Sequence, residues 1–108
     1  MASLTVQAIQ GLGAPALQAA AAGGDTMPLD AKVKVTIGGT ATTVTLTPVG
    51  PYIKGAPARV IGPLTNATID EPGWKYPGHK GRPEKGRLDI TYSQVVNVNT
   101  GAYTQQGA

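Results

Sequence analysis

The chain has 108 residues, with fifteen Gly, nine Pro and no Cys. This length fits one domain, and the lack of cysteine excludes disulfides and thiolate metal sites. The net charge of +3 suits contact with an acidic surface but does not by itself indicate a nucleic-acid partner. We find neither a secretory signal nor a run of the ~18–20 apolar residues that a bilayer span requires. We therefore expect a soluble protein, made in a cytoplasm, with no membrane partner.

The first half of the chain contains several strand signals. Residues 4–9 alternate and predict a short strand. Segment 14–22 is Ala-rich, and either one or two helical turns or an irregular surface segment would fit it. Residues 32–37 and 42–47 alternate clearly between apolar and polar side chains. Because the link at 38–41 contains Gly-Gly, the two runs predict a β-hairpin.

The second half is richer in turn residues. Prolines restrict segment 48–57 to loops or edge strands. Short strands are predicted at 59–61 and 64–69, followed by a Gly/Pro-rich loop at 71–87. The last predicted strand covers 87–98, with a β-bulge where two consecutive valines break the alternation.

Together these signals predict an all-β fold. We expect a small antiparallel β-sandwich or barrel of five to seven short strands, with long Gly/Pro loops and extended terminal arms. A single domain would cover residues 1–108. Residues 1–30 would form an N-terminal arm, 31–99 the β core and 100–108 a polar tail. Because the chain has no Phe, its small core favours an oligomer or a protein stabilised by docking.

Residues that could perform chemistry are scarce. His79 is the only histidine and has no other metal ligand close in sequence, so we expect no metal site. The serines are Ser3 and Ser93, and only one histidine is available as the base that a serine nucleophile needs. The sequence also contains no phosphate-binding loop motif. We therefore expect no catalytic residues, no cofactor and no enzymatic activity.

One segment combines aromatic and basic residues, and it supplies the candidate binding residues Trp74, Lys75, Tyr76, Lys80, Arg82, Lys85 and Arg87. Such a loop can anchor a partner protein through its aromatics while its cations meet carboxylates. A solvated loop is the plain alternative. Stacking on single-stranded nucleic acid is disfavoured because a second basic patch is missing. A carbohydrate platform would have to use Trp74, Tyr52, Tyr76 and Tyr103.

Several short motifs occur in an order that resembles a known family. They are Leu4-Thr5-Val6-Gln7, Gly13-Ala14-Pro15, Ala21-Ala22-Gly23-Gly24-Asp25, Thr43-Val44-Thr45-Leu46, Ile61-Gly62-Pro63 and Asp89-Ile90-Thr91-Tyr92-Ser93. The chain is similar in these motifs to small proteins encoded near the major capsid gene of tailed phages of actinobacteria. It differs from them in a shorter 48–59 segment and an inserted loop at 74–87.

The resemblance implies a capsid decoration, or cement, protein on the surface of the virion. Its partner would be the major capsid protein, and it would be a homo-oligomer, with a trimer favoured. The family defines no catalytic residues. A head–tail connector or tail component, present in about six or twelve copies as a closed ring, is the alternative. A carbohydrate- or nucleic-acid-binding module is the third reading.

Overall fold

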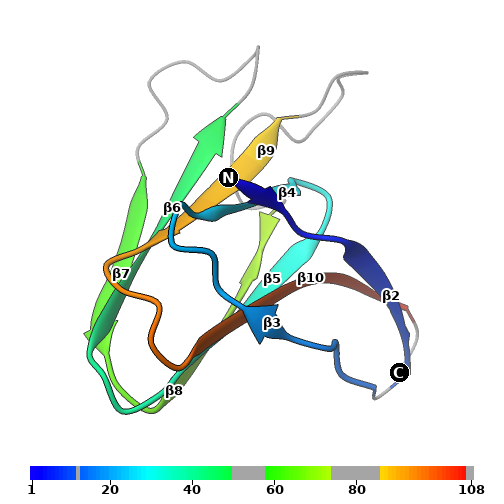
Figure 1. Cartoon of the computed structure of the whole chain (residues 1–108). Coiled ribbons are helices and arrows are strands. Elements are labelled where there is room, and N and C mark those ends of the chain that lie inside the picture. The colour runs from blue at the N-terminus through cyan, green and yellow to red at the C-terminus, as the bar shows by residue number, and fades with distance from the viewer. Residues whose placement is uncertain (12, 50–57, 74–85, 107–108) are drawn as a thin grey trace.

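Two β-sheets pack face to face in the computed structural model, which describes residues 1–11, 13–49, 58–73 and 86–106 (Figure 1). The first sheet, sheet A, has the order β1 (Ala2–Ser3), β4 (Asp25–Pro28), β9 (Arg87–Tyr92), β6 (Thr42–Val49) and β7 (Arg59–Leu64). Sheet B has the order β2 (Val6–Gln10), β10 (Val98–Gln106), β5 (Lys32–Ile37) and β8 (Ala67–Pro72), and β3 (Gln18–Ala19) pairs with β10. The prediction of an all-β sandwich is confirmed, and the sheets do not close into a barrel.

The core lies between the two sheets. β5 and β6 bury every second residue, as expected for strands that cover a core with one face only. The same alternation recurs at the buried positions of β9. The fully buried apolar side chains include Leu29, Val33, Val35, Val44, Leu46, Leu88 and Ile90.

The predicted hairpin of β5 and β6 is wrong. β5 pairs with β8 and β10 in sheet B, whereas β6 pairs with β7 and β9 in sheet A. Residues 38–41 therefore cross from one sheet to the other. Alternation identifies the buried face of a strand, but strands that face one another across a core show the same alternation as neighbours within one sheet.

The predicted terminal arms are also wrong. Residues 98–106 form β10, which lies between β2 and β5 in sheet B. Within residues 1–30, four short strands form, and Met27 and Leu29 are buried in the core. The pairings of β1 with β4 and of β2 with β10 are parallel, so the sheets are mixed rather than purely antiparallel.

Strand boundaries account for the remaining differences. Ten short strands are described instead of five to seven. The predicted strand 87–98 is two strands, β9 and β10, because the chain reverses before Asn97, whose φ is +56°; no bulge lies within a strand there. Segment 14–22 contains the short strand β3 and no helix. Of the two alternatives for this segment, the irregular surface segment is therefore the better match. β8 extends to Pro72, inside the predicted loop.

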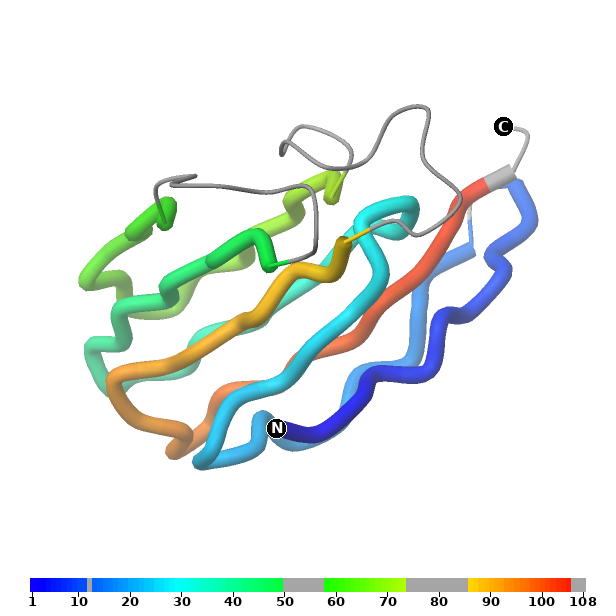
Figure 2. Tube along the Cα trace, turned by 90° about the horizontal axis from the view of Figure 1, so that it is seen from above, coloured from blue at the N-terminus to red at the C-terminus, as the bar shows by residue number. Residues whose placement is uncertain are grey.

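Each open side of the sandwich is covered in a different way (Figure 2). On one side, β1 runs along sheet A and β2 runs along sheet B, and Leu4 between them is buried. On the other side, Arg59 of β7 forms an ion pair with Glu71 of β8 at 3.5 Å. The N-terminal segment 2–10 connects the two sheets at one margin, and the Arg59–Glu71 ion pair connects them at the opposite margin.

Candidate functional site at the loop end of the sandwich

The residues that flank the two longest connections lie at one end of the sandwich. Val49, at the end of β6, is paired with Arg87, at the start of β9. Lys32, at the start of β5, is paired with Pro72, at the end of β8. Segments 50–57 and 74–85 therefore both connect to this end, which we call the loop end.

A short turn at residues 29–31 fixes both borders of segment 74–85. The Gly73 amide donates a hydrogen bond to the Ala31 carbonyl at 2.8 Å, and the Leu29 amide donates to the Gly86 carbonyl at 3.3 Å. A Cβ on Gly73 would lie only 2.7 Å from the Leu29 carbonyl oxygen and 2.8 Å from that of Ala31. Because Leu29 is fully buried, the borders of this segment are attached directly to the core.

Arg87 is the candidate binding residue that the structure places. Its Nε donates to Asp89 Oδ1 at 3.0 Å, and the same oxygen accepts from Thr26 Oγ1 at 2.9 Å. The Arg87 side chain is 56% exposed, so this pair adds little stability. Its guanidinium is oriented by Asp89 and still accessible to a partner.

The positive charge of the chain is concentrated in the sequence of the two connections. The described residues contain four Lys or Arg and five Asp or Glu, which gives a formal charge of −1. Segments 50–57 and 74–85 contain five Lys or Arg and one Glu, which gives +4. An acidic partner surface would therefore be attracted to the loop end.

Of the sequence-predicted binding residues the structure places Arg87, and its role in binding stays a prediction. Trp74, Lys75, Tyr76, Lys80, Arg82 and Lys85 lie outside the described residues, as does His79, so their roles remain predictions. Sequence reasoning missed Asp89 and the Arg59–Glu71 ion pair. The spacing of Arg87 and Asp89 could have predicted their ion pair, because residues two apart on a strand lie on the same face of the sheet. The Arg59–Glu71 pair needed knowledge of which strands lie at the same margin.

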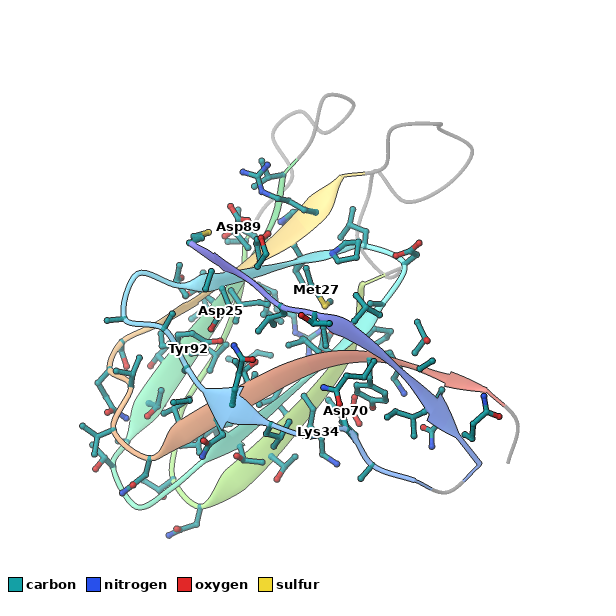
Figure 3. The ribbon with its side chains drawn as sticks, turned by 45° about the vertical axis from the view of Figure 1, so that its right-hand side comes forward. Asp25, Met27, Lys34, Asp70, Asp89 and Tyr92 are labelled. Carbon is teal, nitrogen blue, oxygen red and sulfur yellow. The ribbon has the colours of Figure 1, made fainter. Side chains whose placement is uncertain are left out.

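A second polar cluster lies inside the sandwich (Figure 3). Tyr92 Oη donates to Asp25 Oδ2 at 2.8 Å, and the Ala21 amide donates to the same oxygen at 3.2 Å. Asp25 and Thr100 are both fully buried. Within the described part of the chain, Asp25 Oδ1 and Thr100 Oγ1 have no hydrogen-bond partner. This cluster holds the turn before β4 against β9, which is a structural role.

A third cluster occupies the outer face of sheet B. Tyr103 Oη donates to the Asp70 carboxylate, with distances of 2.7 and 2.6 Å to its two oxygens, and Lys32 Nζ lies 5.4 Å from the centre of the Tyr103 ring. Tyr103 is only 3% exposed. It therefore cannot serve as the exposed stacking platform considered for a carbohydrate.

Both of these tyrosines should resist ionisation. Burial, helped by the neighbouring Asp25 or Asp70 carboxylate, raises the pKa of Tyr92 and of Tyr103 above the ordinary value of 10.0. Below pH 10 both the folded and the unfolded chain keep these phenols protonated. Above it the unfolded chain ionises first, so the free energy of unfolding should fall as the pH rises beyond about 10.

The measurement is an alkaline titration followed by phenolate absorbance and by circular dichroism. We expect two of the four tyrosines to ionise only together with unfolding. In Tyr103→Phe, one of these two delayed phenols should disappear from the titration. Four tyrosines that titrate together in a chain that stays folded would contradict this expectation.

No family model, curated protein or solved structure is significantly similar to the chain. Among the described residues, no three His, Asp or Glu side chains come together as a metal site. The same part of the chain contains no helix long and apolar enough to cross a membrane.

Proposed function

We propose that the chain is a structural virion protein that binds the outer surface of a tailed-phage capsid through its loop end and stabilises it. The proposal is carried by one observation: the connections with the net positive charge both join the sandwich at the same end. The order of the family-like motifs supports the identity of the partner, the major capsid protein.

The β-sandwich suits this role in physical terms. The core and the ion pair between the sheets described above are made by residues outside segments 50–57 and 74–85, and the proposal assigns those two segments to the partner. The Gly73 and Gly86 hydrogen bonds to the turn at 29–31 reduce the freedom of the borders of segment 74–85 before docking, which lowers the entropic cost of binding. Many copies on one shell, grouped as trimers, would add avidity.

Copy number tests the proposed role directly. Quantitative gels of purified virions should show this chain at a number comparable to that of the major capsid protein. A value of about six or twelve per particle would instead indicate a head–tail connector or tail ring. Absence of the chain from purified particles would overturn both.

Charge substitutions test the proposed surface. We expect Lys80→Ala and Arg82→Ala, combined, to reduce occupancy on stripped capsids about tenfold, and the reduction should shrink at high salt because the attraction is screened. Trp74→Ala should weaken docking as well, since buried aromatics dominate interface energies.

The matched control is Lys34→Ala, which removes a cation from the middle of β5, two residues from the loop end. Its occupancy should equal that of the wild-type chain. Equal occupancy of the Lys80/Arg82 variant, or an equal loss in the Lys34 variant, would show that the loop end is not the docking surface.

A further inference from the structure

Five of the described strands lie at sheet edges, and four of them carry features that discourage pairing with another strand. β1 and β3 are each two residues long. β7 contains Arg59, Gly62 with a φ of +118°, and Pro63. β8 contains Asp70, Glu71 and Pro72. Short length, charges, prolines and kinks are the ordinary means by which proteins protect sheet edges.

β2 has none of these features. Its sequence Val-Gln-Ala-Ile-Gln has no charge, proline or glycine, and its pairing with β10 runs through five residues without a register shift. Among the described strands, only β10 pairs with β2, so the other side of β2 is an unpaired edge at the margin of the fold (Figure 1), apart from the Gln10 carbonyl, which accepts a hydrogen bond from the Gly13 amide at 3.1 Å. Unpaired amide and carbonyl groups along such an edge can accept a further strand.

The side chains of β2 are also incompletely covered. Val6 is 37% exposed, and Ala8 is exposed as well. Both are paired with inward-facing positions of β10, Val6 with Ala102 and Ala8 with Thr104. They remain uncovered because the N-terminal strand has passed from sheet A to sheet B at Leu4. An added strand would therefore extend an apolar surface as well as a hydrogen-bonding edge.

We propose that this edge pairs with the same edge of a second copy of the chain, antiparallel and about a twofold axis at Ala8. In this register Ala8 lies opposite Ala8 of the second copy, Val6 opposite Gln10, and Gln7 opposite Ile9. No charged residue meets its own copy, although the chain as a whole carries +3. Two copies of sheet B would become one continuous sheet, through an isologous contact.

The proposal does not depend on the capsid role and differs from the trimer expected there. A five-residue strand pair buries less than the ~1,200 Å² typical of stable complexes, so we expect a weak, concentration-dependent dimer. Sedimentation equilibrium of the purified full chain, up to about 500 μM, should show the mass rising from one chain towards two.

Charge substitutions at the axis give the decisive comparison. Ala8→Lys places two like charges directly opposite each other and should weaken association up to about fivefold. Ala8→Glu should do the same, and mixing the two variants should restore the dimer. Since Ala8 is exposed, circular dichroism should show both variants folded. Val60→Lys, at an exposed position of β7, is the matched control and should associate like the wild type.

Four results would overturn the proposal while leaving the capsid role untouched. Three of them are a wild-type chain that stays monomeric at the highest concentration, a trimer in solution, and a Lys and Glu mixture that does not recover association. Loss of association in Val60→Lys alone would move the contact to β7 and also overturn it.

Discussion

Gly73→Ala should lower the free energy of unfolding by about 2–3 kcal/mol, at the upper end of the usual cost of inserting a methyl group into a filled space. The new Cβ would meet two carbonyl oxygens of the turn at 29–31, those of Leu29 and Ala31, at 2.7 and 2.8 Å. Both are backbone atoms, so a side-chain rotation cannot relieve the contact. The hydrogen bond from Gly73 to Ala31 would lengthen at the same time.

Gly39→Ala is the matched control. A Cβ on Gly39 has no atom within 4 Å, and Gly39 is not among the glycines with positive φ. Its stability should be unchanged or up to about 1 kcal/mol higher, because alanine restricts the unfolded chain. Urea unfolding of the two variants measures the difference. Equal stability would mean that the turn at 29–31 moves freely with Gly73, contrary to the anchored borders described above.

Tyr92→Phe should cost about 1.5–3 kcal/mol, the range for hydrogen bonds to charged groups. The substitution keeps the ring and removes the phenol that donates to Asp25 Oδ2. Asp25 is fully buried, and its other oxygen has no partner among the described residues. Of the described hydrogen bonds to the Asp25 carboxylate, only that from the Ala21 amide would remain.

Thr100→Val gives the opposite expectation at a neighbouring position. The Thr100 hydroxyl is fully buried and lies beside the Tyr92 phenol, where its influence opposes the rise in the pKa of Tyr92, but no described atom lies in hydrogen-bonding geometry with it. Valine has nearly the same shape, so the variant should be as stable as the wild type or more stable. Thermal unfolding of both variants separates the cases. A loss in Thr100→Val as large as that in Tyr92→Phe would show that the hydroxyl does have a partner in solution.

The sequence located strands more reliably than it located their neighbours. The predicted run 32–37 coincides with β5, and 42–47 lies within β6, because alternation reports directly that one face is buried. Strand pairing depends on which elements meet across the whole chain, and alternation does not report it. The hairpin prediction failed for that reason.

The prediction of a C-terminal tail was wrong because it relied on the polarity of the residues. Apart from Tyr103, residues 100–106 are small or polar, yet they form most of the nine-residue β10, since backbone pairing on both sides and three inward positions suffice to hold it. For the candidate site, Arg87 could be read from the sequence together with its neighbours. The role of Leu29 and Gly73 in fixing the borders of segment 74–85 could not, because their contacts join segments distant in the chain.

The pairing of Val6 with Ala102 has a consequence for the speed of folding. It joins residues separated by nearly the entire sequence, and pairings of this kind form slowly because a large loop must close first. We expect β2 to be the last strand to dock and refolding to take milliseconds to seconds, as in other proteins with distant strand partners. Until then the side of β10 that β2 covers stays unpaired, so the refolding chain is most exposed to aggregation along that side.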